Sequence, residues 1–72
     1  MATYRLSTRI ELVGARDFNI VVNATPDAPI AAVIRSDTEH SLAQAEARRD
    51  NLVVKLEDEL RLQGHKVLGV NE

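Results

Sequence analysis

The chain has 72 residues, contains no cysteine and carries a net charge of −2 at neutral pH. This length predicts one domain spanning residues 1–72. The absence of cysteine excludes disulfides and thiolate metal sites, and the charge lacks the basic footprint of a nucleic-acid-binding domain. A core of this size supplies only roughly 3–5 kcal/mol of net stability, so oligomerisation is the expected support.

Two alternating segments at the N-terminus predict a β-hairpin. Apolar and polar side chains alternate from Thr3 to Val13 and again from Phe18 to Thr25, with the period of two that is typical of half-buried strands. Residues 14–17 between them are turn formers and include a glycine. One face of the hairpin is therefore expected to pack in the core and to include both aromatic residues, Tyr4 and Phe18. The other, polar face would carry Arg5, Ser7, Arg9, Glu11, Asn19, Val21 and Asn23.

A proline-rich break separates the hairpin from the rest of the chain. Pro26-Asp27-Ala28-Pro29 predicts a turn or short loop, because proline fixes φ and lacks the backbone donor. The short apolar run from 30 to 35 that follows is consistent with a third strand, and a helical extension is the alternative.

Residues 36–64 predict one long amphipathic helix. Ser36 followed three residues later by Glu39 matches a capping box, and Gly64 suits the residue just after a helix end. At 100° per residue, one face collects an apolar stripe that is interrupted by Arg49 at its centre. The stripe comprises Leu42, Ala45, Arg49, Leu52, Val53, Leu56, Leu60 and Gln63.

The segment from His65 to Val70 reads as a last strand. The order of elements is then strand, strand, strand, helix, strand. Packing the apolar strand faces on the helix stripe gives a small two-layer α+β sandwich, in which an antiparallel sheet rests on one long helix. Such a sheet leaves one face open and leaves strand edges whose backbone groups can pair with another chain.

Five residues are the candidates for contacts with a partner. Arg49 lies inside the apolar stripe, where it either reaches the edge of the core with Glu46 as its partner or crosses a subunit interface. Val54 and Leu62 point away from the stripe and are either scattered surface residues or a dimer contact. Arg5 and Arg9 share the open face, with Asn19 and Asn23 expected opposite them.

Catalytic, metal-binding and cofactor-binding motifs are not found in the sequence. His40 and His65 lack ligand spacing, the serines fit no nucleophile signature, and the glycines are too scattered for a phosphate loop. The acidic run Glu57-Asp58-Glu59 points in three directions on a helix. We therefore expect no enzyme and no cofactor. No stretch approaches the roughly 18 apolar residues of a membrane span, so we expect a soluble, cytoplasmic protein.

Elimination and surplus apolar surface favour a small non-enzymatic protein-interaction or structural module that acts as a homodimer and binds an unidentified protein. The alternative is a regulatory module linked to nucleic acid or to inhibition of a nucleic-acid-binding protein. In its helix entry, Ser36-Asp37-Thr38, and in the general order of its elements, the chain resembles small antitoxin domains of the HicB type. The resemblance extends to no specific set of residues.

Overall fold

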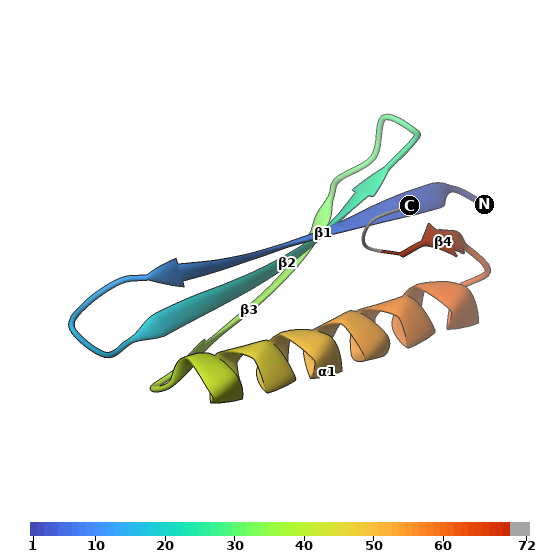
Figure 1. The fold of residues 1–72 in the computed structure, drawn as a ribbon. Coiled ribbons are helices and arrows are strands. Elements are labelled where there is room, and N and C mark those ends of the chain that lie inside the picture. Colours follow the sequence, from blue (N-terminus) through green and yellow to red (C-terminus); the bar gives the residue numbers. More distant parts are fainter. Residues whose placement is uncertain (70–72) are drawn as a thin grey trace.

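The computed structural model describes residues 1–69. Along this part of the chain lie β1 (Thr3–Leu12), β2 (Phe18–Pro26), β3 (Val33–Glu39), α1 (Leu42–Leu62) and β4 (Lys66–Leu68). The strands form one sheet in the order β3-β2-β1-β4, and α1 runs along one face of it (Figure 1). The predicted two-layer α+β fold is confirmed.

The N-terminal hairpin matches its prediction. β1 and β2 pair antiparallel from Tyr4 opposite Pro26 to Leu12 opposite Phe18, without a bulge. Because side chains alternate between the faces of a sheet, this register places the even-numbered residues of both strands, nearly all of them apolar, on the side of α1. The buried core of the described chain consists of Ala2, Tyr4, Leu6, Ile20, Val22, Ala24, Ala45, Leu52, Leu56, Leu60 and Val67.

The sheet is mixed, which corrects the prediction of an antiparallel sheet. β3 runs antiparallel to β2, and α1 then carries the chain back along the sheet. The chain therefore re-enters the sheet in the direction of β1, and β4 pairs parallel to it, with Thr3 opposite Lys66 and Arg5 opposite Leu68. The described strand is shorter than the predicted segment from His65 to Val70, and Val70 lies outside the described residues.

The start of α1 was predicted wrongly. Ser36 and Glu39 are not a capping box but belong to β3, where the backbone pairs with β2 as far as Glu39 opposite Phe18. The helix begins at Leu42, and the N-cap is Ser41, whose Oγ accepts a hydrogen bond from the Gln44 backbone N–H at 3.2 Å. Both serines have Glu or Gln three residues later, so local sequence offers two caps, and strand pairing selects the second.

The end of α1 agrees with its prediction. Gln63 is the C-cap, and Gly64 follows with φ of 87°. This left-handed conformation carries no steric cost for glycine. In the last turns of the helix, Glu57 and Arg61 form an i,i+4 ion pair at 3.1 Å.

The third strand is present but lies three residues later than predicted. The expected run was 30–35, whereas β3 spans Val33–Glu39 and begins opposite Ala24. Ile30 lies in the connecting loop, where its N–H donates to the Ala28 carbonyl at 2.7 Å. Pro26, which was predicted to lie in the turn, is the last residue of β2, and Pro29 lies in the loop. Neither proline has a backbone N–H for the ladder, and pairing with β2 begins only at Val33.

Candidate interaction edge

β3 forms one edge of the sheet, and within residues 1–69 it pairs with β2 alone. The hydrogen bonds at the two ends of the hairpin show which backbone groups face outward. Thr3 O accepts from the Asp27 N–H and the Val13 N–H donates to Asp17 O, both at 2.9 Å, so odd-numbered residues of β1 face β2. Backbone groups alternate in direction along a strand, so the odd-numbered residues of β2 face β1 and its even-numbered residues face β3. The even-numbered residues of β2 pair with odd-numbered residues of β3, which leaves the even-numbered residues of β3 facing outward. These are Ile34, Ser36 and Thr38.

Two of these outward groups are capped by neighbouring side chains. The Arg35 guanidinium donates to the Ile34 carbonyl at 3.2 Å, and the Thr38 N–H donates to Asp37 Oδ1 at 2.8 Å. Both contacts agree with the outward direction obtained from the hairpin. Ser36 lies between them with its backbone N–H and carbonyl facing the same way. The edge therefore presents three consecutive outward positions, of which the outer two are held by single side-chain contacts.

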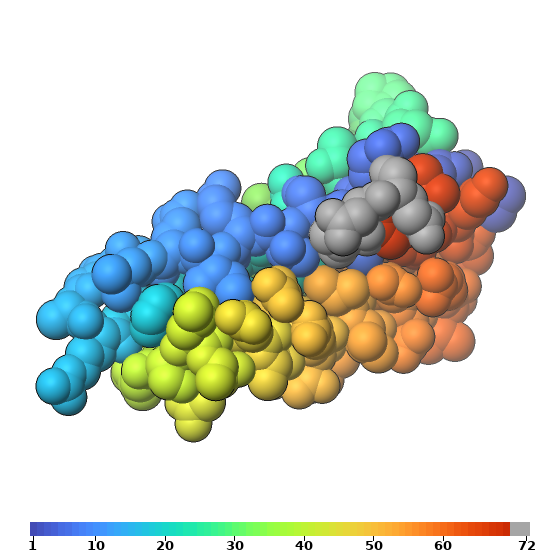
Figure 2. Space-filling view, in the orientation of Figure 1, coloured from blue at the N-terminus to red at the C-terminus, as the bar shows by residue number. Residues whose placement is uncertain are grey.

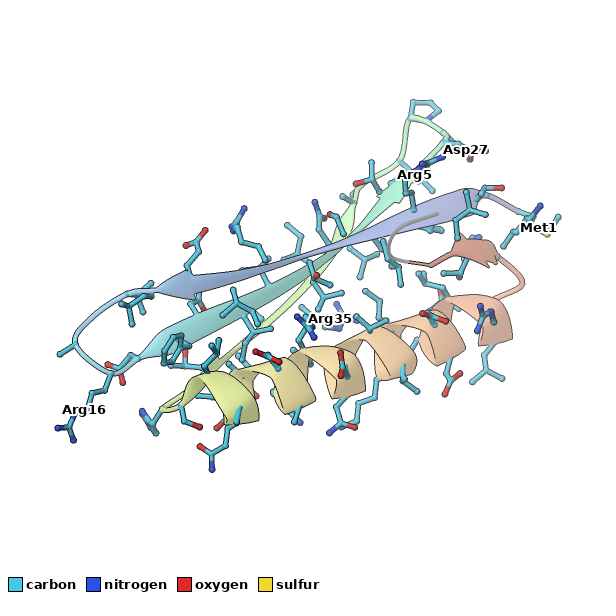
Figure 3. The ribbon with its side chains drawn as sticks, in the orientation of Figure 1. Met1, Arg5, Arg16, Asp27 and Arg35 are labelled. Carbon is cyan, nitrogen blue, oxygen red and sulfur yellow. The ribbon has the colours of Figure 1, made fainter. Side chains whose placement is uncertain are left out.

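The face of β3 toward α1 is charged and tied to the helix. Arg35 pairs with Glu59 at 3.0 Å, and Asp37 pairs with Arg48 at 2.6 Å. Figure 3 shows Arg35 between the sheet and the helix. The two ion pairs connect β3 to the side of α1 that borders the edge. All four groups are at least one-third exposed, so each pair contributes little stability by itself.

The pKa of Asp37 lies below its ordinary value of 3.8, mainly because its carboxylate accepts the Thr38 N–H and also because it accepts a hydrogen bond from Arg48. The ionised form is thus favoured in the folded state. Its stabilising effect is complete above the unfolded pKa and disappears as the pH falls through the lower, folded pKa.

Acid unfolding should therefore report on this edge. Asp37→Asn is expected to flatten the decrease in unfolding free energy that the unchanged protein shows as the pH falls below the ordinary carboxyl pKa of 3.8, since the variant has no carboxylate to protonate at this position. Urea unfolding at several pH values measures this decrease. Asp58→Asn is the matched control, because Asp58 is exposed on α1 and makes no ion pair within residues 1–69. Equal slopes for the two variants would contradict the prediction.

The three predicted helix candidates do not form one surface. Arg49 lies in the apolar stripe with its side chain 33% exposed, and its ion pair is with Asp50 at 3.2 Å, not with Glu46. Val54 and Leu62 lie on the solvent side, with exposures of 58% and 88%. They are two helical turns apart along α1. A contact between any of these residues and a partner stays a prediction.

The open sheet face carries Arg5 and Arg9, but with different neighbours than predicted. Arg5 is opposite Thr25 and Arg9 is opposite Val21, while the two asparagines face other residues. Arg9 forms an ion pair with Glu11. Figure 3 shows Arg5 near the loop that holds Asp27, at the other end of the strand from the hairpin turn.

A shallow hollow of about 300 Å³ lies on this face, lined by Ser7, Thr8, Arg9, Val21, Asn23 and Ile34. Asn23, one of the lining residues, has a buried Oδ1 with no hydrogen-bond partner within the described chain. The hollow borders β3 through Ile34, so the edge and the open face meet there.

The histidines lie beyond opposite ends of α1. His40 Nδ1 is 2.9 Å from Asp17 Oδ1, which links the helix entry to the projecting hairpin end (Figure 2). His65 Nδ1 accepts the Ala2 N–H at 3.1 Å, and its ring contacts Tyr4 edge-on with centroids 5.0 Å apart. Within residues 1–69, no three His, Asp or Glu side chains are grouped so as to hold a metal ion. In the same range, no helix has the length and apolar character needed to cross a membrane.

Sequence reasoning missed the edge because it assigned residues 36–39 to the helix. The missing signal was the alternation of Arg35, Asp37 and Glu39 with Ser36 and Thr38, which continues the strand period.

Comparison of the chain with protein-family models, curated proteins and solved structures gave no match.

Proposed function

We propose that this chain is a small non-enzymatic protein-interaction module that acts as a homodimer in the cytoplasm, and that the edge strand β3 is its binding element. The observation that carries the proposal is the row of three outward positions on a seven-residue edge strand. Strand addition at such an edge is a common mode of protein recognition, in which backbone hydrogen bonds supply affinity and side chains supply specificity.

Two further features support association. Large apolar side chains are exposed around the molecule, among them Ile34 on the edge strand itself. The small hydrophobic core also supplies little net stability to a monomer. The location is proposed from the sequence, because a chain without cysteine suits a reducing compartment.

The mass in solution tests the homodimer. Sedimentation equilibrium at micromolar concentration is expected to give twice the mass of one chain, and the apparent stability should rise with protein concentration. A single-chain mass in a sample that stays folded on dilution would contradict the proposal.

The nucleic-acid alternative rests on Arg5 and Arg9 of the open face. Phosphate contacts from such a face are chemically reasonable. Sheets that bind single-stranded RNA add aromatic side chains for base stacking, and here Tyr4 and Phe18 belong to the opposite face, which packs on α1. With Arg9 also paired to Glu11, the protein-interaction function is the one we put forward.

A further inference from the structure

We propose that the partner of β3 is β3 of a second copy, paired antiparallel about a twofold axis that passes through Ser36. This inference rests on the proposed function and specifies its interface. The pairing joins two four-stranded sheets into one continuous sheet, with both helices on the same face. The interface is isologous, so each contact occurs twice.

The backbone of β3 is complementary to itself in this register. Ser36 faces Ser36, and because its N–H and carbonyl both point outward, the two residues exchange both hydrogen bonds. Ile34 faces Thr38 of the second copy, so the outward carbonyl of one meets the outward N–H of the other. These are the two groups that the single chain caps with Arg35 and Asp37. Pairing therefore replaces each side-chain contact with a ladder hydrogen bond.

The side chains released from this capping are complementary too. In the same register Arg35 lies opposite Asp37 of the second copy, at a position between ladder hydrogen bonds where side chains approach most closely. Opposite charges across strands stabilise pairing. Each released charge already has a partner on its own helix, Glu59 for Arg35 and Arg48 for Asp37. The interface thus carries a row of alternating charge, which runs from Glu59 to Arg35 of one copy and on to Asp37 and Arg48 of the second copy. The twofold axis generates a second, identical row.

Other registers lose this match. A shift by one residue sets outward backbone groups against inward ones, since direction alternates along each strand. A shift by two residues moves the axis by one residue, to Arg35 or Asp37, and sets two like charges directly opposite each other. A shift by four residues moves the axis to Ile34 or Thr38. The first of these places Arg35 opposite Val33, and the second places Asp37 opposite Glu39, an acid facing an acid. The charges of β3 therefore select the axis at Ser36.

Cysteine cross-linking tests the axis, because the natural chain has no thiol. Ser36→Cys is expected to form a covalent dimer on mild oxidation, since residues in such a pair have Cα atoms about 5.5 Å apart, within the roughly 4.4–6.8 Å range of disulfides. Ser7→Cys is the matched control, an exposed serine on the same sheet face but in β1, and it should stay uncross-linked. Non-reducing electrophoresis of dilute samples reads the result.

A second pair of variants measures affinity without covalent trapping. Ser36→Lys sets two like charges directly opposite each other at the axis and is expected to raise the dimer dissociation constant about tenfold, whereas Ser7→Lys should leave it unchanged. Circular dichroism confirms that each variant is folded. A dimer that survives Ser36→Lys, with no cross-link at Ser36→Cys, overturns this inference while the proposed homodimer stands. A folded monomer of the unchanged chain overturns both.

Discussion

Leu56→Ala should destabilise the protein by about 2–5 kcal/mol, because it removes buried methyl groups and leaves a cavity. Leu56 is 1% exposed at the centre of the helix face that packs on the sheet. A loss of this size equals most of the net stability expected for a core this small, so the variant should be largely unfolded at room temperature. Urea unfolding, followed by circular dichroism at one fixed protein concentration, measures it.

The same substitution at Leu62 is the control. Leu62 belongs to the same helix but is 88% exposed, and truncation there is expected to change the unfolding free energy by less than about 0.5 kcal/mol. A large effect at Leu62 in a concentration-dependent transition would place this residue in the association surface. Equal effects at the two positions would contradict the orientation of α1.

Val22→Thr is expected to cost about 1–3 kcal/mol, because it places a hydroxyl in an apolar site where the group loses its water. Val22 is 0% exposed on the central strand β2. The substitution keeps the branched shape, so strand propensity hardly changes. Val21→Thr is the matched control on the open face of the same strand, and it should be nearly neutral. The comparison uses equilibrium unfolding of both variants.

The control also reports on the open face. Association through the β3 edge adds strands to the sheet and leaves the open face uncovered. Val21 therefore stays accessible to solvent in the proposed dimer. A cost at Val21 as large as that at Val22 would mean that a second layer covers the open face. It would move the association surface from the edge to the hollow around Asn23.

The hairpin was predictable because its pattern is local and repeated. Nine consecutive residue pairs of β1 and β2 keep one register, and a slip by one residue would turn every apolar side chain to the open face. The end of α1 was predictable because its signal is also local: Gly64 has a φ of 87°, and few residue types other than glycine adopt this conformation.

The candidate edge was not predictable in this way. Residues 36–39 suit a helix start and an edge strand equally well by local criteria. The decision depends on pairing with residues of β2 that lie 15 to 21 positions earlier in the chain, from Val21 opposite Ser36 to Phe18 opposite Glu39. The direction of β4 also depends on a distant element, because the short segment after Gly64 can pair with β1 only after α1 has crossed the sheet. The alternation along residues 35–39 is compatible with a strand, but a window of ten residues does not include the strands that decide either choice.

The sequence by itself determined the apolar face of each long element and therefore the two layers, because burial of alternating and helical stripes requires no knowledge of the partner element. Tertiary structure decided which serine caps α1, which strand runs parallel, and which backbone groups lie at the free edge. Those features depend on pairing between segments far apart in the chain. The proposed binding element, Ile34 to Thr38, is one of them.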